Sequence, residues 1–266
     1  MDGIKIGGII MKIITVSTQK GGVGKTTTAI NIAAALAEMN KKVLLVDLDP
    51  QGNATTGSGI DNMNVKTISD AMKADIEGTF TLKDLYISSN EEYDVLASNI
   101  ELANVELSLG NVYARESVLK RVLEPVKRKY DYIVIDTLPS LGILTANAFT
   151  VADFVLVPIL AKDIYSLQGF DALVHSINVV RRCINPNLEI LGEIITMYDG
   201  RNKNDKIISQ MVKDDERTNV FNSVIPSSTK VAEANRNGQS VIKYEPNGKA
   251  AEAYRRLAEE ILERMK

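Results

Sequence analysis

An apolar run, Lys12–Ser17, leads directly into Gln19-Lys20-Gly21-Gly22-Val23-Gly24-Lys25-Thr26-Thr27, and a stretch with helical periodicity, Lys25–Met39, follows. Glycines allow a backbone to curl so that successive N–H groups point at one anion, and the N-terminus of the next helix adds positive potential. The order of strand, glycine-rich loop and helix therefore predicts a phosphate-binding loop. Lys25 is expected to reach the outer phosphates of a nucleotide, and the Thr26 hydroxyl to complete the shell of a Mg²⁺ ion.

This loop departs from the usual phosphate-loop pattern at two positions. Gln19 stands where the pattern has its first glycine, and a second lysine, Lys20, follows it. Two ammonium groups on one loop repel each other unless an anion lies between them. We therefore expect Lys20 to serve a nucleotide across a dimer interface, and the alternative is a surface lysine at the end of a strand.

Acidic residues end two further apolar runs. Asp47 and Asp49 are two residues apart and point to the same face of a strand. Asp47 is expected to close the strand next to the phosphate loop, and Asp49 to orient an attacking water. Asp136 ends the run Tyr132–Asp136, a pattern that delivers a carboxylate to Mg²⁺. Thr26, Asp47 and Asp136 thus predict a hydrated metal site, and the alternative for Asp47 and Asp49 is a pair of turn-forming carboxylates.

Composition excludes several classes of protein. The 266 residues, 45% of them hydrophobic, can bury one sizeable core. A net charge of −3 excludes a globally basic nucleic-acid binder, so any contact with DNA must come from a local patch. The single Cys183, expected in the core, and the single His175 exclude a disulfide framework and Cys-rich or multi-histidine metal sites within one chain. The sequence has neither a membrane-spanning run nor a signal peptide, which predicts a cytoplasmic protein with no membrane contact.

Apolar runs alternate with helical patterns along the whole chain, which predicts an α/β fold: one mostly parallel, twisted sheet with helices on both faces. We expect one domain over residues 11–266, preceded by an N-terminal extension at residues 1–10. Strands are predicted at Lys12–Ser17, Lys42–Asp47, Tyr93–Ala97, Tyr132–Asp136, Phe154–Pro158, Glu189–Met197 and Val220–Ile225. Helices are predicted at Lys25–Met39, Thr67–Ala74, Ile100–Leu109, Val112–Lys127, Leu144–Val151, Leu167–Arg182, Lys203–Lys213, Lys230–Asn237 and Asn247–Arg264.

In combination, five segments resemble the ParA/Soj family of partitioning ATPases, which carry the deviant Walker A form of the phosphate loop. The segments are Lys20–Thr26, Asp47–Asn53, Pro139–Gly142, Thr196–Arg201 and Val224–Pro226. The similarity runs from about Met11 to the C-terminus, and the family's fold agrees with the predicted one. The resemblance implies ATP and Mg²⁺ as ligands and an ATP-bound sandwich homodimer.

The resemblance also implies roles for individual residues. Lys20 would reach the partner's nucleotide, Asp49 would orient or activate the hydrolytic water, and Asp136 would hold the metal through water. Met197 and Pro226 fall where family members surround the adenine, although both positions are equally compatible with core or turn residues. The catalytic residues would be Lys20, Lys25 and Asp49. The ATP-binding residues would be Lys20, Gly21, Gly22, Val23, Gly24, Lys25, Thr26, Thr27, Met197 and Pro226.

Family members bind DNA without sequence preference as ATP dimers, and a ParB-like centromere-binding partner stimulates hydrolysis and releases them. The resemblance thus implies nucleoid association and a slow ATPase that acts as a timer. The chain departs from many relatives at Ser227, where they carry arginine. A DNA surface would then need other basic residues, which are otherwise a solvated face. These are Arg201, Lys203, Lys206, Lys230, Arg236 and Lys243.

Two alternatives concern what the ATPase acts on. A MinD-like protein that positions cargo at a membrane or protein cluster would need a C-terminal helix that enters lipid, but the apolar stripe from Tyr254 to Met265 lies on a helix with a net acidic polar face. That balance favours a helix docked on the protein. A regulator that switches partners with little turnover is the second alternative, and the presence of Asp49 argues for hydrolysis instead.

Overall fold

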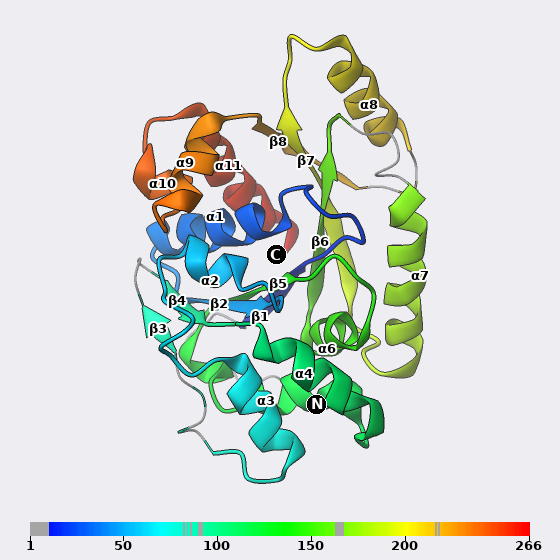
Figure 1. Ribbon diagram of the computed structural model, residues 1–266. Coiled ribbons are helices and arrows are strands. Elements are labelled where there is room, and N and C mark those ends of the chain that lie inside the picture. Colours follow the sequence, from blue (N-terminus) through cyan, green and yellow to red (C-terminus); the bar gives the residue numbers. More distant parts are fainter. Residues whose placement is uncertain are drawn as a thin grey trace.

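The computed structural model of the chain describes residues 11–81, 83, 85, 87–89, 93–162, 168–215, 217 and 219–266 (Figure 1). The predicted N-terminal extension at residues 1–10 and the predicted helix start at Leu167 lie outside these residues.

The described residues form one eight-stranded sheet in the order β3-β4-β2-β5-β1-β6-β7-β8. Neighbouring strands are parallel except for β3, which pairs with β4 in the antiparallel direction, so the predicted α/β fold with a mostly parallel sheet is confirmed. The strands are β1 (Lys12–Val16), β2 (Val43–Leu48), β3 (Ser88–Ser89), β4 (Asp94–Leu96), β5 (Tyr132–Thr137), β6 (Phe154–Leu160), β7 (Glu189–Tyr198) and β8 (Val220–Pro226).

Helices follow most strands, as the sequence predicts. They are α1 (Lys25–Glu38), α2 (Asn53–Gly57), α3 (Ile68–Ile76), α4 (Glu101–Ser108), α5 (Val118–Leu123), α6 (Ile143–Val151), α7 (Gln168–Cys183), α8 (Lys203–Asp214), α9 (Thr229–Arg236), α10 (Val241–Tyr244) and α11 (Lys249–Arg264). The single helix predicted over Val112–Lys127 is wrong. A 3-10 turn at Arg115–Ser117 precedes α5, and α5 ends at Leu123 because Pro125 has no backbone N–H to donate to the carbonyl of Arg121.

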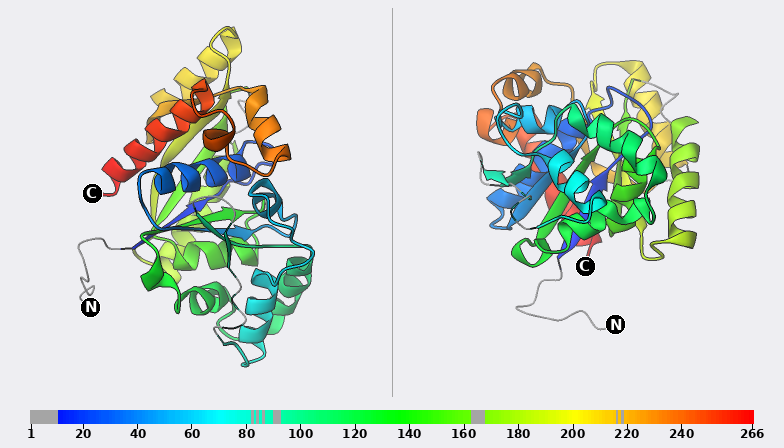
Figure 2. Two further views of the ribbon diagram at one scale, coloured as in Figure 1. Left: turned by 90° about the vertical axis from the view of Figure 1, so that its left-hand side faces the viewer. Right: turned by 60° about the horizontal axis from the view of Figure 1, so that its bottom comes forward.

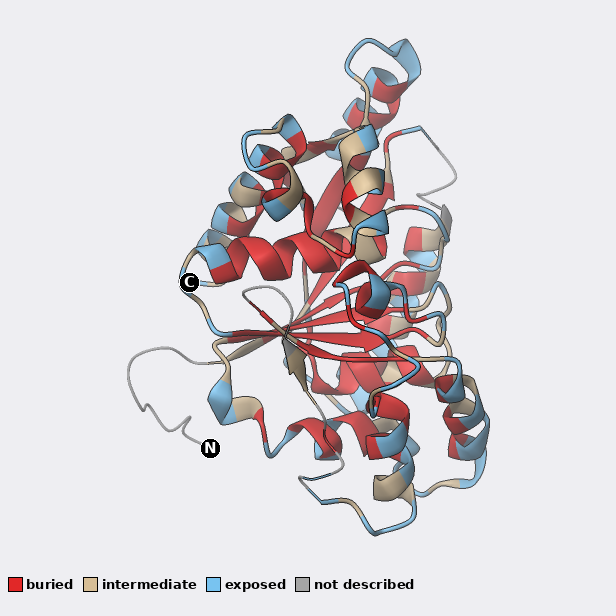
Figure 3. Cartoon of the chain, turned by 60° about the vertical axis from the view of Figure 1, so that its left-hand side comes forward, coloured by how far each residue is buried: buried red, intermediate tan, exposed pale blue. Residues whose placement is uncertain are grey.

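Side chains alternate between two apolar layers, one on each face of the sheet. Ile13 of β1 packs into the layer covered by α3 to α7, whereas its neighbour Ile14 packs against α1 and α11. Figure 2 shows these helices above and below the sheet, and Figure 3 shows that the strands and α1 are almost entirely buried. Burying each such aliphatic side chain contributes about 1.5–3 kcal/mol, which makes the sheet a rigid base for the loops at its edge.

The last helix, α11, is docked on the protein. Tyr254, Leu257 and Ile261 are each at most 1% exposed and pack against α1 and β8. The apolar stripe of α11 is therefore already covered, which agrees with the prediction of a docked helix. Cys183, predicted in the core, is instead exposed at the C-terminal end of α7. Among the described residues, no helix is both long enough and apolar enough to span a bilayer.

One prediction about strand order needs correction. Asp47 was expected on the strand next to the phosphate loop, but β5 lies between β1 and β2. In the register of these strands, Asp136 is aligned with Val16 on one side and with Asp47 on the other. The carboxyl groups of Asp47 and Asp136 therefore come from adjacent strands, just where the phosphate loop leaves β1.

Candidate functional site

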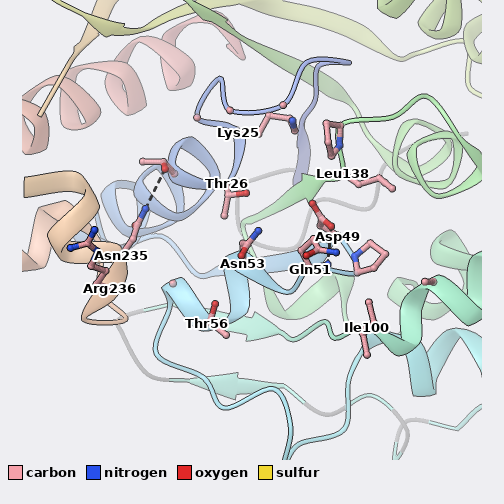
Figure 4. A pocket seen from close by; sticks show the side chains of 18 of the residues that line it. Lys25, Thr26, Asp49, Gln51, Asn53, Thr56, Ile100, Leu138, Asn235 and Arg236 are labelled. Atoms are coloured by element: carbon pink, nitrogen blue, oxygen red, sulfur yellow. Dashed lines mark hydrogen bonds between the residues drawn. The ribbon is translucent and has the colours of Figure 1, made fainter. Parts of the chain in front are cut away.

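A cavity of about 870 Å³ lies where the phosphate loop, α2, α4 and α9 meet (Figure 4). This is the edge at which the parallel strands end, the usual place for ligands in such sheets. Its lining consists of Gly21, Gly22, Gly24, Lys25, Thr26, Thr27, Asp49, Pro50, Gln51, Asn53, Thr56, Gly57, Ile100, Ala103, Leu138, Pro139, Met197, Asn235 and Arg236.

The phosphate loop has the curled backbone that its sequence predicts. Gly22 and Gly24 have φ angles of 73° and 86°, a region that side chains other than glycine rarely adopt, and Gly24 caps α1. The Lys25 ammonium turns back and donates a hydrogen bond to the Lys20 carbonyl oxygen at 2.9 Å. Burial lowers the pKa of Lys25, and the charges of Asp136 and Asp49 oppose that shift. Lys25 thus lies between the loop and the acidic side chains.

Thr196, at the end of β7, holds the loop from behind. Its hydroxyl lies 2.8 Å from the carbonyl oxygen of Val23 and 3.1 Å from that of Ile159, and it is 2% exposed. A single hydroxyl proton shared between these two carbonyls ties the loop to β6 and β7. Met197 follows with a φ of 54° and lines the cavity beside Gly24. The sequence contained Thr196 within a family motif but gave no sign of this role.

Asp136 is fully buried at the end of β5, and neither of its carboxylate oxygens accepts a hydrogen bond from the described residues. Burial, followed by the nearby charge of Asp47, raises the pKa of Asp136 well above its usual range, and the neighbouring Thr26 hydroxyl opposes this shift. A buried carboxylate without donors is costly unless a cation or a cation-bound water satisfies it. This environment fits a Mg²⁺ ion that keeps waters and takes phosphate oxygens as ligands. Among the described residues, no cluster of three or more acidic, His or Cys side chains is arranged to hold a metal by itself.

Asp47, unlike Asp136, accepts hydrogen bonds on both of its carboxylate oxygens. Its Oδ2 accepts hydrogen bonds from the backbone N–H and hydroxyl of Thr55 at 2.8 and 2.7 Å, and its Oδ1 accepts one from the Asp49 N–H at 3.1 Å. Burial raises the pKa of Asp47 to about 6, and these hydrogen bonds oppose the shift. Asp47 thereby fixes the segment that carries Asp49 and the start of α2.

Asp49 faces the cavity and is 8% exposed. Its side chain accepts a hydrogen bond from the Gln51 N–H at 2.9 Å, and its carbonyl accepts one from the Ser98 hydroxyl at 2.8 Å. Gly52 has a φ of 64°, and a Cβ there would lie only 2.8 Å from the Ser98 carbonyl oxygen, so glycine is required. The side chain and the backbone carbonyl of Asp49 are thus each held by one hydrogen bond.

Helix α9 forms a wall of the cavity that sequence reasoning missed. The Asn235 side chain donates a hydrogen bond to the Thr27 hydroxyl at 3.3 Å, and Arg236 lines the cavity beside it (Figure 4). Arg236 had been predicted to contact DNA. Pro226, predicted near the adenine, ends β8 in register with Tyr198 and is not among the residues lining the cavity.

The other residues predicted to contact DNA are Arg201 before α8, Lys203 and Lys206 on α8, Lys230 on α9 and Lys243 on α10, and two of them are paired with acidic side chains. Arg201 forms an ion pair with Asp199 at 2.9 Å, and Lys230 forms one with Glu233 at 2.7 Å. Lys203 is exposed at the start of α8. Charge that is paired within the protein is less available for phosphate contacts.

Comparisons with known proteins cover nearly the whole chain. Residues 11–190 match a family described as "AAA domain". The chain is 41% identical to the sporulation initiation inhibitor protein Soj of Bacillus subtilis, over 94% of this chain and 98% of that protein. It is 39% identical to the chromosome partitioning protein ParA of Myxococcus xanthus, over 95% and 88% of the two chains. A solved structure of cobyrinic acid a,c-diamide synthase from Mycobacterium smegmatis, with bound ADP and magnesium, is 32% identical with a TM-score of 0.83 over 96% of each chain.

Proposed function

The chain belongs to the ParA/Soj family of P-loop ATPases, and we propose that it hydrolyses ATP with Mg²⁺ as a homodimer to segregate DNA. The observation that carries this proposal is the position of Asp49, a carboxylate held rigidly in the cavity beside the phosphate loop. The identity to Soj and ParA, 41% and 39%, exceeds the 32% to the synthase, so we base the function on the former.

ATP binding uses the wall of the cavity that the phosphate loop forms, which we call the loop wall. The backbone N–H groups of residues 21–27 surround the phosphates, and the Lys25 ammonium moves from the Lys20 carbonyl to the outer phosphates. The Thr26 hydroxyl and, through water, Asp136 would hold Mg²⁺. When bound, this ion neutralises charge that develops on the phosphates. Both oxygens of Asp47 already accept hydrogen bonds, so we assign Asp47 to holding Asp49 in place behind the metal site.

Hydrolysis requires a water in line with the outermost phosphate. We assign Asp49 to orient that water and to accept its proton, a contribution of about 10²–10⁴-fold for a positioned base. Asp47 and Ser98 hold the backbone of Asp49, so the carboxylate needs little rearrangement to act.

The open cavity supports dimerisation. Ile100, an apolar residue that is 60% exposed, stands on the α4 side of the cavity mouth, and Leu107 of the same helix is 79% exposed. A second copy placed over the mouth would cover these side chains, exclude water from the phosphates and bring its Lys20 to the partner's nucleotide. We include nonspecific DNA and a ParB-like stimulating protein as partners, on the basis of family membership.

The alternative of positioning cargo at a membrane has less support from the structure. The apolar residues of α11 are buried against α1 and β8, and exposing them would cost about 1.5–3 kcal/mol for each large side chain. A MinD-like action would therefore need another lipid-binding segment.

The test is ATP turnover by the purified chain with and without duplex DNA and a candidate partner. Asp49→Ala is expected to retain ATP-driven dimers while turnover falls at least about 100-fold, because the water loses its base. Lys20→Gln is expected to bind ATP but to lose the turnover that depends on dimers. Unchanged turnover in Asp49→Ala would contradict the assigned role, and stimulation by lipid instead of DNA would favour membrane positioning.

A further inference from the structure

A small pocket of about 270 Å³ lies at the edge of the sheet where β2 begins, opposite the nucleotide cavity. The six residues of β2 span about 20 Å at roughly 3.3 Å per residue, so this pocket and the nucleotide cavity lie about one strand length apart. We call it the lysine pocket. It is lined by Lys41, Lys42, Val43, Asp94, Lys129 and Tyr130.

Backbone hydrogen bonds build the lysine pocket. The N–H of Lys42 donates to the Asp131 carboxylate at 2.8 Å, and the N–H of Asp131 donates to the Lys42 carbonyl at 2.8 Å. The Tyr130 hydroxyl donates to the Asp94 carboxylate at 2.8 Å, and burial followed by this bond raises the pKa of Tyr130. The carboxylates of Asp94, in the pocket, and Asp131, beside it, are therefore hydrogen-bonded by neighbouring residues, whereas within the described residues no hydrogen bond holds the lysine ammonium groups of the pocket.

The charge around the pocket is strongly positive. Lys42, Arg128 and Lys129 are exposed, and Lys41 is half-buried. Across the described ranges of the chain, none of these four cations forms an ion pair, in contrast to Lys127, whose ammonium lies 2.9 Å from Glu124. In a chain with a net charge of −3, four such cations on two adjoining segments form a local patch of the opposite sign.

The chemistry of this patch fits the phosphates of a nucleic acid better than a bilayer. Membrane-surface segments combine basic residues with exposed apolar ones. The large apolar side chains exposed on the described part of the chain are Met63, Ile100, Leu107, Tyr113, Val179, Ile184, Met197, Ile207 and Met211. None lies in the two segments that form the pocket, so the patch offers charge without an apolar anchor.

We propose that the lysine pocket binds phosphate groups of duplex DNA, with Lys41, Lys42 and Lys129 as the contacting residues. This inference rests on the proposed DNA-segregating function and identifies a surface of the protein that would contact the DNA. The ion pairs of Arg201 and Lys230 and the place of Arg236 in the nucleotide cavity reduce the charge available at the positions predicted from the sequence to contact DNA. Because the pocket lies at the edge opposite the nucleotide, its contribution to DNA affinity is independent of the nucleotide state.

The test compares two triple variants with equal loss of charge. One is Lys41→Gln with Lys42→Gln and Lys129→Gln. The control is Lys73→Gln with Lys120→Gln and Lys213→Gln, three exposed lysines on α3, α5 and α8 that are neither predicted to contact DNA nor part of the nucleotide cavity. Affinity for a random-sequence duplex is measured by fluorescence anisotropy over a range of salt concentrations, with ATP and with ADP. Each lost phosphate contact should reduce the slope of log K against log salt by about 0.9.

We expect the slope of the pocket variant to fall by about 2–3 for each bound protomer, both with ATP and with ADP, and the slope of the control to change by less. Basal ATP turnover should match that of the unsubstituted protein, because the pocket is remote from the cavity. The single variant Lys129→Gln, whose side chain is exposed, should lower the slope by about 1 and guards against misfolding of the triple variant.

The outcomes separate the two proposals. If the unsubstituted protein binds no DNA, the proposed function fails and this inference with it. If that protein binds DNA and the pocket variant keeps its slope, the inference alone is overturned. Loss of binding to anionic phosphatidylglycerol vesicles in the pocket variant, with DNA binding unchanged, would assign the pocket to lipid headgroups and also overturn it.

Discussion

The two walls of the nucleotide cavity are built in different ways. The loop wall comes from one continuous segment, residues 21–27, between a strand and a helix. The acidic wall, where Asp49 lines the cavity, is supported from behind by residues far apart in the sequence: Asp47, Thr55 and Ser98 form one chain of hydrogen bonds, and Asp136 comes from the neighbouring strand. Local sequence thus specifies the phosphate site, whereas tertiary hydrogen bonds specify the position of the Asp49 carboxylate.

The largest effect is expected from breaking the acidic wall at Thr55. The hydroxyl of this buried residue donates to Asp47 at 2.7 Å and accepts from the Ser98 N–H at 2.9 Å. Thr55→Val keeps the shape but leaves a buried carboxylate and a buried N–H short of partners, which should destabilise the protein by about 2–4 kcal/mol. ATP turnover should fall with it, because Asp49 loses its support. Urea unfolding and steady-state turnover measure the two effects.

Thr56→Val is the matched control for stability. Thr56 is exposed, and its hydroxyl bonds only the carbonyl of Gly52 in the preceding turn, at 3.2 Å. The same substitution there should change the free energy of unfolding by less than about 1 kcal/mol. Equal losses of unfolding free energy in the two variants would show that the hydrogen bonds of Thr55 stabilise the protein no more than the exposed hydrogen bond of Thr56 does.

The same contrast explains what the sequence could predict. The order of strand, glycines, Lys25 and Thr26 is local, so the parallel sheet and the loop wall followed from pattern alone. The burial of Asp136 could be predicted from the apolar run that precedes it in the sequence. Ser98 and Asn235 gave no local signal, because their roles depend on contacts 49 and 208 residues away along the chain, with Asp49 and Thr27. Strand order also lacks a local signal, so β5 was not expected between β1 and β2.

Glu193 on β7 offers a second buried carboxylate for comparison with Asp136, outside the cavity. Its Oε2 accepts a hydrogen bond from the Asn219 N–H, its Oε1 has no partner among the described residues, and burial raises its pKa to about 7. Because the folded-state pKa lies above the ordinary 4.5, the folded protein holds more protons between these values. Stability should therefore decrease as pH rises from about 4.5 to about 7 and level off above that range.

Glu193→Gln isolates this effect. The amide keeps an acceptor for the Asn219 N–H but does not ionise. At pH 5 the variant and the unsubstituted protein should unfold at similar urea concentrations, whereas at pH 8 the variant should be more stable by up to about 3 kcal/mol. ATP turnover should follow the same pH profile in both, because Glu193 does not line the cavity. A stability difference that does not depend on pH would contradict a raised pKa of Glu193 in the folded protein.

The smallest effect on stability is expected at the loop wall. There, Thr196 of β7 supports the phosphate loop through a contact between residues far apart in the sequence. Thr196→Val removes the hydroxyl that lies 2.8 Å from the Val23 carbonyl and should cost about 1–2 kcal/mol of stability. Local glycine geometry continues to shape the loop, so we expect weaker ATP binding with nearly unchanged turnover at saturating ATP. Thr196→Ser restores the hydroxyl and should restore the affinity. If instead turnover collapses while the affinity for ATP is kept, the loop wall depends on distant contacts as strongly as the acidic wall does, and the distinction between local and tertiary specification fails.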